Sequence, residues 1–143
     1  WAPHPKALPH AVANSFVNIT KRMDAKLTIT HPEGYELNSD ITNGVYVTND
    51  QNEAFENADF IYAKNWSSFN NYGKVLKKDL DWMITKSKMN LTNNAKFMHC
   101  LPIRRNVVAS DEVIESNNSL ILNQVENRIY SAQSVLKTII ENG

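Results

Sequence analysis

The sequence is poor in cysteine and glycine, and neither sign of charge is in excess. Its 143 residues include one cysteine, Cys100, and four glycines, and 15 basic side chains balance 15 acidic ones. A single cysteine excludes an internal disulfide and favours a reducing compartment, so we expect a cytoplasmic protein. Zero net charge argues against broad electrostatic binding to nucleic acid or to anionic lipid, and we expect neither as a partner.

Several cofactor and metal motifs are also absent. Gly34, Gly44, Gly73 and Gly143 are too far apart to form a phosphate-binding loop, and no G-x-G-x-x-G occurs. No C-x-x-C, H-x-H or H-E-x-x-H spacing supports a metal site, and no G-x-S-x-G elbow supports a serine hydrolase. No apolar run approaches the roughly 18 residues of a membrane span. We therefore expect no nucleotide cofactor, no metal ion and no membrane association.

Short apolar runs alternate with segments of helical periodicity along the chain. The predicted strands cover 26–30, 45–48, 60–63, 96–100 and 120–122, and the predicted helices cover 7–23, 49–57, 76–84, 85–91, 110–116 and 126–140. Apolar strands separated by helices are typical of βαβ units. We therefore predict an α/β fold, with a doubly wound, mostly parallel, Rossmann-like sheet of about five strands and helices on both faces.

The length predicts one domain, spanning residues 1–143. Its first three residues, Trp1-Ala2-Pro3, have the pattern of the end of a strand whose beginning is missing. This pattern favours a fragment of a longer protein.

Reactive side chains follow the predicted strands at the points where the strands end. In chain order they are His4, His31, Lys64, His99, Cys100, Arg104, Arg105 and Arg128. In an open parallel sheet, ligands bind beyond the carboxyl ends of the strands. The sequence therefore predicts a cationic, hydrogen-bonding rim that suits a small molecule carrying carboxylate or phosphate groups.

Each of these residue types also has a purely structural explanation. His4 and His31 precede prolines, where a histidine is more often a turn residue than a ligand, and a cysteine at a strand end, like Cys100, is usually a small buried apolar residue. His99 and Cys100 are adjacent in a strand, so their side chains point to opposite faces and cannot act as a nucleophile–base pair. Arg128 lies in the first turn of the predicted helix 126–140, where a cation opposes the helix dipole, so we expect an anionic partner for it.

Four short segments resemble the aspartate/ornithine transcarbamylase family. They are WAPHPK at 1–6, HCLP at 99–102, RRN at 104–106 and ENR at 126–128. The resemblance covers nearly the whole chain and is nearest to the branch that acts on N-acylated ornithine in Bacteroides-like bacteria. It implies that residues 1–143 are the C-terminal, amino-acid-binding half of a two-domain subunit, without the N-terminal carbamoyl-phosphate domain, and that the subunits form a homotrimer.

The resemblance also implies a reaction and a role for several residues. A carbamoyltransferase of this branch moves the carbamoyl group from carbamoyl phosphate to the δ-amine of an N-acylated ornithine, giving N-acylcitrulline and phosphate in arginine biosynthesis. No cofactor is needed. Carried over by position, Arg128 contacts carbamoyl phosphate, and Cys100 with the Leu101 carbonyl orients the reacting groups.

The substrate-binding residues implied by the resemblance are His4, Lys64 and Arg104, which would hold the carboxylates of the acylornithine. The resemblance also implies that the last helix crosses onto the N-terminal domain, which would explain its apolar stripe. Packing of that stripe on this domain's own sheet explains it equally well.

One departure from ordinary ornithine carbamoyltransferases is chemically informative. They carry an Asp-x-x-x-Ser-Met-Gly-like stretch whose Asp meets the substrate's α-ammonium, whereas this chain reads KNWSSFN from Lys64 to Asn70. A lysine at this place repels a free α-ammonium and attracts the α-carboxylate of a substrate whose α-amine is already an amide. We therefore expect an N-acylated ornithine as the substrate. The resemblance, and not the lysine, favours N-succinyl-L-ornithine, with N-acetylornithine as the alternative. A non-catalytic carboxylate-binding α/β module and a nucleotide-dependent doubly wound enzyme remain as rival hypotheses.

Overall fold

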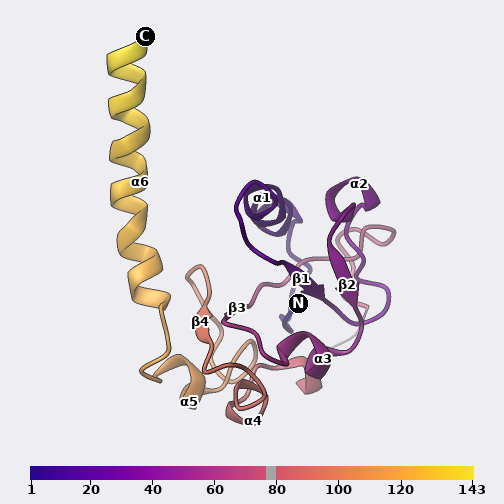
Figure 1. Ribbon diagram of the computed structural model, residues 1–143. Helices are drawn as coiled ribbons and strands as arrows, with labels where there is room; N and C mark the ends of the chain where they lie inside the picture. Colours follow the sequence, from indigo (N-terminus) through magenta and orange to yellow (C-terminus); the bar gives the residue numbers. More distant parts are fainter. Residues whose placement is uncertain (77–79) are drawn as a thin grey trace.

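The computed structural model describes residues 1–76 and 80–143. Within them the elements are α1 (Ala11–Thr20), β1 (Thr28–Thr30), α2 (Ser39–Thr42), β2 (Tyr46–Thr48), α3 (Gln51–Phe55), β3 (Phe60–Tyr62), the 3-10 helix η1 (Leu80–Trp82), α4 (Lys86–Met89), β4 (Lys96–Met98), α5 (Asp111–Ile114) and α6 (Ile121–Asn142). Helices alternate with parallel strands, as Figure 1 shows. The predicted α/β class is confirmed.

The described strands form two parallel pairs. β1 pairs with β2, with Ile29 opposite Val47, and β3 pairs with β4, with Ile61 opposite Phe97. Parallel neighbours need a crossover connection, and here α2 separates β1 from β2 while η1 and α4 lie between β3 and β4. The carboxyl ends of paired strands therefore lie on the same edge, as the sequence pattern predicts.

The first residues of the chain join the two pairs. The Trp1 nitrogen donates to the carbonyl oxygen of Thr30 at the end of β1, and the Ala2 N–H donates to Lys64, just after β3, at 3.0 Å. The strand order reverses here, because β1 and β2 lie to one side of this segment and β3 and β4 to the other. A point where the order of an open α/β sheet reverses is the usual place for a ligand.

The predicted strand at 120–122 is wrong. The Phe97 N–H donates to Asn118 at 2.9 Å, and the Leu120 N–H donates back to Phe97 at 2.8 Å, so the backbone here pairs with β4 as an isolated bridge at Ser119 and not as a strand. The chain then enters α6 at Ile121. The apolar residues at 121, 125 and 129 continue the helical spacing of the predicted helix 126–140 toward its N-terminus. The three apolar residues 120–122 fit a strand or a helix equally well, and the longer helical pattern decides for the helix.

Two buried clusters form the core. The cluster around β3 and β4 is Ala2, Phe55, Ile61, Ala63, Ile84, Ala95, Phe97, Val108, Ala109, Val113 and Ile121. The cluster around β1 is Trp1, Ala13, Val17, Ile29, Tyr35, Leu37 and Trp66. Because Trp66 belongs to the second cluster, the segment that follows β3 is anchored in the interior and is not a free surface loop.

Phe97 is expected to be a major contributor to stability because its side chain is fully buried at the centre of the first cluster. Phe97→Ala should lower the free energy of unfolding by about 3–5 kcal/mol. Phe60→Ala is the matched control, since Phe60 is 63% exposed on the adjacent strand, and it should cost less than about 1 kcal/mol. Urea denaturation measures both, and equal losses would contradict this assignment of the core.

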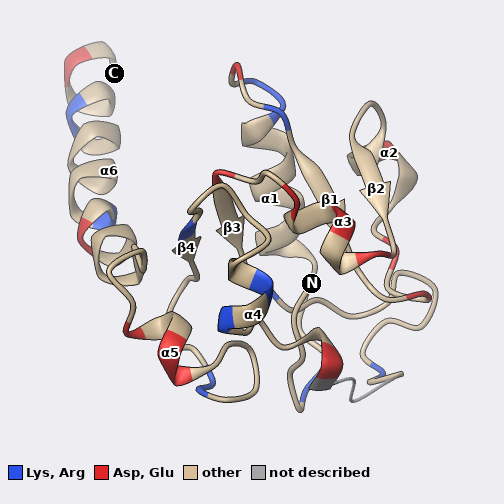
Figure 2. Cartoon of the chain, turned by 60° about the horizontal axis from the view of Figure 1, so that its bottom comes forward, with Lys and Arg blue, Asp and Glu red and all other residues tan. Residues whose placement is uncertain are grey.

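The last helix, α6, stands apart from the rest of the chain in both Figure 1 and Figure 2. Ile121 is its only buried residue. Its exposed apolar side chains are Leu122, Val125, Ile129, Tyr130, Val135, Leu136, Ile139 and Ile140. Packing of the helix 126–140 on this domain's own sheet is therefore wrong, and its apolar face is uncovered within the described part of the chain.

Two further segments differ from the prediction. The predicted helix 76–84 runs through 77–79, which lie outside the described residues, and its described part is η1. The single turn α2 is too short to show helical periodicity; it is capped by Asn38, whose side chain accepts from the Asp40 N–H at 2.9 Å. No helix in the described ranges is long and apolar enough to cross a membrane.

Candidate functional site

Residues from three separate loops meet at the carboxyl ends of the strands. The Arg104 Nε donates to the Nε2 of His4 at 3.3 Å, joining the loop after β4 to the loop after the first residues. Lys64, directly beyond β3, is near enough that its charge lowers the pKa of both His4 and His99. The structure thus brings together three of the residues expected on the rim, and it does so where the strand order reverses.

Both ring nitrogens of His4 have polar neighbours. Its Nε2 accepts from the Arg104 Nε at 3.3 Å, while its Nδ1 lies 3.0 Å from the Lys6 carbonyl oxygen and 3.1 Å from the Lys6 backbone nitrogen, whose N–H donates to it. Burial lowers the pKa of His4 and the charges of Arg104 and Lys64 lower it further, while the bond to Lys6 opposes these effects. His4 is therefore a neutral hydrogen-bonding group between two cations.

The positive charge of this cluster is uncompensated. Among the described residues, Lys64 and Arg104 form no ion pair with a carboxylate. Like charges held close together favour the binding of an anion, and a guanidinium suits the planar geometry of a carboxylate. The cluster can therefore bind a carboxylate group without first breaking an internal ion pair.

The neighbouring Arg105 has a different role. Its Nε lies 2.6 Å from Asp111 and its Nη1 lies 2.6 Å from Glu115, both on or beside α5. Asn106 also donates to Asp111, at 2.9 Å. Arg105 thus ties the loop to α5, whereas Arg104 faces His4. The family resemblance singles out Arg104, whereas position after a strand end does not distinguish the two arginines.

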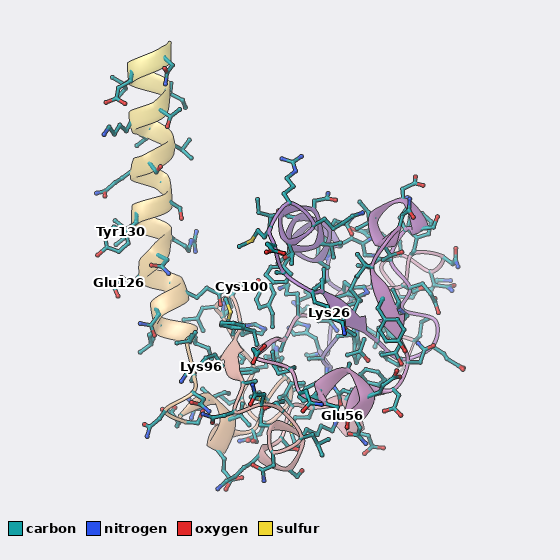
Figure 3. All side chains as sticks on the ribbon, in the orientation of Figure 1. Lys26, Glu56, Lys96, Cys100, Glu126 and Tyr130 are labelled. Atoms are coloured by element: carbon teal, nitrogen blue, oxygen red, sulfur yellow. The ribbon has the colours of Figure 1, made fainter. Side chains whose placement is uncertain are left out.

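His99 and Cys100 differ in burial, as expected for adjacent residues at a strand end. His99 is 4% exposed, its Nδ1 has no hydrogen-bond partner among the described residues, and burial followed by the charge of Lys64 lowers its pKa to about 4. Cys100 is half-buried beyond the carboxyl end of β4, near the N-terminal end of α6, as Figure 3 shows. Leu101, the next residue, is exposed.

Tyr62, at the end of β3, is close to Cys100. Burial, together with the nearby Cys100 thiol, raises the pKa of the Tyr62 hydroxyl to about 12.

The lowered pKa of His99 predicts a loss of stability in mild acid. Below its ordinary pKa of 6.5 the unfolded chain binds a proton that folded His99 does not accept until about pH 4. The free energy of unfolding should therefore fall between these pH values, by up to about 3 kcal/mol from His99 alone. His99→Asn should flatten this part of the profile in urea titrations at several pH values. An unchanged profile would contradict the prediction.

Two more of the predicted rim residues, His31 and Arg128, also lie outside the cluster. His31 is buried, and its Nδ1 lies 2.9 Å from the Pro32 carbonyl oxygen. The Asn49 side-chain amide donates to the backbone carbonyl oxygen of His31 at 2.7 Å. The role of His31 is therefore structural. Arg128 is exposed on α6, and its side chain makes no hydrogen bond or ion pair with any described residue. Because α6 begins at Ile121, Arg128 lies beyond the first turn, and the argument from the helix dipole is wrong.

The segment after Lys64 is more ordered than its polar composition indicates. The Asn65 amide donates to Ala2 at 2.9 Å, and its oxygen accepts from the Leu8 N–H at 3.4 Å. The Ser67 N–H donates to Leu8 at 2.9 Å. Trp66, a large aromatic residue inside a polar stretch, was the one sequence signal of this order.

Residues 9–139 match the family model of the Asp/Orn-binding domain of aspartate/ornithine carbamoyltransferases. The chain is 51% identical over 143 residues to N-succinylornithine carbamoyltransferase of Bacteroides thetaiotaomicron, and 32% identical over 158 residues to N-acetylornithine carbamoyltransferase of Xanthomonas campestris. These matches cover 99% and 98% of this chain but 45% and 47% of the relatives, so the chain spans about half their length.

A crystal structure of acetylornithine transcarbamylase complexed with acetylcitrulline has the same fold, with a TM-score of 0.89 at 33% identity. The match covers 95% of this chain and 46% of that chain. A mutant of N-acetyl-L-ornithine transcarbamylase complexed with carbamyl phosphate and N-succinyl-L-norvaline matches similarly, with a TM-score of 0.89 at 32% identity.

Proposed function

The chain belongs to the aspartate/ornithine carbamoyltransferase family, and from that premise we propose that it is the C-terminal, amino-acid-binding half of an N-acylornithine carbamoyltransferase. The proposed reaction moves the carbamoyl group from carbamoyl phosphate to the δ-amine of the acylornithine, giving N-acylcitrulline and phosphate in arginine biosynthesis. N-succinyl-L-ornithine is the favoured substrate, since two relatives at 51% and 50% identity are N-succinylornithine carbamoyltransferases. The single cysteine supports a cytoplasmic location.

The uncompensated positive charge of Lys64 and Arg104 beside neutral His4 is the observation that carries this proposal. An ornithine with a free α-amine would bring an ammonium group to this cluster and would be repelled. An N-acylated ornithine has no such charge, and its carboxylates are attracted instead. The cluster therefore selects for acylation of the α-amine.

The reaction needs positioning and charge stabilisation more than acid–base chemistry. The neutral δ-amine attacks the carbonyl carbon and the new C–N bond forms, while the bond from that carbon to the phosphate oxygen breaks and one proton of the amine leaves with the phosphate. We assign carboxylate binding to His4, Lys64 and Arg104, orientation of the carbamoyl group and amine to Cys100 and the Leu101 carbonyl, and contact with carbamoyl phosphate to Arg128. Fixing two substrates in one geometry and placing a cation near developing negative charge are both effective ways to lower the barrier.

We further propose that the whole protein supplies an N-terminal half that binds the phosphate of carbamoyl phosphate and covers the apolar face of α6. The exposure of that face supports this, as does the length of the relatives, of which the chain spans 45% and 47%. A homotrimer, as expected from the family resemblance, would be the assembled form.

A substrate comparison on the full-length protein tests the proposed function. N-succinylornithine, N-acetylornithine and ornithine are supplied in parallel with carbamoyl phosphate, and the citrulline derivatives are quantified. We expect the highest kcat/KM with N-succinylornithine and the lowest with ornithine. Preferred turnover of ornithine would contradict the proposal. Thermal protection by simple dicarboxylates, without turnover and without any effect of carbamoyl phosphate, would favour a non-catalytic binding module.

A further inference from the structure

His10, the residue directly before α1, makes a close contact with the segment that carries Lys64. Its Nε2 lies 2.6 Å from the carbonyl oxygen of Ser67. A carbonyl oxygen can only accept, so Nε2 carries the proton and donates. Ser67 is 1% exposed, so this hydrogen bond reaches into the buried part of the segment.

The imidazole ring of His10 also contacts two aromatic side chains farther along the same segment. It stacks on Phe69, with ring centroids 6.2 Å apart at 29°, and meets Tyr72 edge-on at 5.2 Å and 83°. Phe69 and Tyr72 are otherwise 48% and 61% exposed. The ring of His10 therefore holds aromatic side chains that lie largely on the surface.

Further hydrogen bonds join segment 8–10, which ends at His10, to segment 65–72, which contains Ser67, Phe69 and Tyr72. The Leu8 N–H donates to the Asn65 side chain at 3.4 Å, and the Leu8 carbonyl accepts from the Ser67 N–H at 2.9 Å. Segment 8–10 follows His4 by four residues, and segment 65–72 directly follows Lys64. The relative position of these two site residues therefore depends on how firmly segment 8–10 is attached to segment 65–72.

We propose that His10 is a positioning residue for acylornithine binding: it holds segment 65–72 so that Lys64 stays beside His4 and Arg104. This inference rests on the proposed function for its choice of substrate. His10 does not touch the substrate, and it acts through Lys64. Loss of His10 should weaken binding of the acylornithine and leave binding of carbamoyl phosphate, assigned to Arg128 and the N-terminal half, unchanged.

Three substitutions in the full-length protein separate the two contributions of His10. His10→Ala removes both the donor and the ring and should raise the KM for N-succinylornithine about tenfold, with kcat and the KM for carbamoyl phosphate nearly unchanged. His10→Gln restores a donor at the position of Nε2, and His10→Phe restores only the ring. Each should recover part of the loss. Asn18→Ala, at an exposed position on α1, is the matched control and should behave as wild type.

A double-mutant comparison with Lys64→Met shows whether His10 acts through Lys64. In that background, His10→Ala should raise the KM for N-succinylornithine by less than about twofold, because the group that His10 positions is already gone. Additive effects would overturn the proposal. Equal increases in the KM values of both substrates, or a lower melting temperature with unchanged kinetics, would also overturn it.

Hydrogen exchange keeps this test separate from the test of the proposed function. In His10→Ala, backbone amides of residues 67–72 should exchange faster than in wild type, whatever reaction the protein catalyses. Unchanged exchange in this segment would overturn the anchoring itself. If His10→Ala exchanges faster but the wild-type protein turns over no acylornithine, the anchoring of the segment by His10 is upheld. The proposed function is then refuted, and with it the role of His10 in acylornithine binding.

Discussion

Lys64→Asp is expected to lower kcat/KM for N-succinylornithine about a thousandfold in the full-length protein. Lys64 lies beside Arg104 and neutral His4 with no carboxylate paired to it among the described residues. The substitution removes one attraction to the substrate's carboxylate and adds a repulsion. A pair of unit charges about 4 Å apart near a protein surface interacts by roughly 4 kcal/mol, which corresponds to about a thousandfold in rate.

Two further variants define the cause of that effect. Lys64→Arg keeps the charge and should retain much more activity than the aspartate variant. Lys86→Asp makes the same charge change at an exposed position in the first turn of α4, outside the cluster, and should leave kcat/KM within about twofold. Steady-state assays with each acylornithine measure all three. Near-normal turnover by Lys64→Asp would refute the assignment of Lys64 to substrate binding.

The α/β class was predictable because all but one of the short apolar runs are followed by a segment of helical periodicity; the exception is 26–30, which α2 follows. β1, β3 and β4 all lie inside predicted strands, and only their ends differ. The failure at 120–122 has a clear physical basis, since three apolar residues fit a strand and the start of a helix equally well. The position of α6 was not predictable from periodicity alone, because an apolar stripe does not specify which surface it packs against.

Only those site residues could be predicted that follow a strand end or that match a motif of the family. His4, Lys64 and Arg104 follow strand ends or lie close behind them, and the structure places them together. The difference between Arg104 and Arg105 depends on the acidic side chains Asp111 and Glu115, which come close only when α5 folds against the loop. Sequence spacing of arginines carries no such information.

His10 illustrates the same limit more strongly. Its partners begin 57 positions later in the chain, and neither a lone histidine before a helix nor a polar loop predicts their contact. The contact exists because Asn65 and Trp66 draw the second segment into the interior. Tertiary packing, which depends on both segments at once, therefore decides which histidines belong to the site.

Arg128→Met is expected to lower kcat/KM for carbamoyl phosphate by about 100- to 1,000-fold, the usual cost of losing one group that stabilises developing charge. Arg128 is exposed on a helix that stands apart from the domain, and it has no partner among the described residues. Under the proposed function, this cation acts on carbamoyl phosphate bound between this half and the proposed N-terminal half. The substitution should therefore leave the melting temperature of the protein without substrates nearly unchanged.

Lys137→Met is the matched control for Arg128→Met, because Lys137 is an exposed cation on the same helix. Its one ion pair with a described residue is the 3.8 Å contact with Glu141. It should leave kcat/KM within about twofold, since an exposed pair of this kind contributes little. An equal loss in both variants would mean that the general charge of α6 matters and not Arg128 itself. A loss confined to the KM for the acylornithine would instead move Arg128 to the other substrate, and the division of the site between the two halves would have to be redrawn.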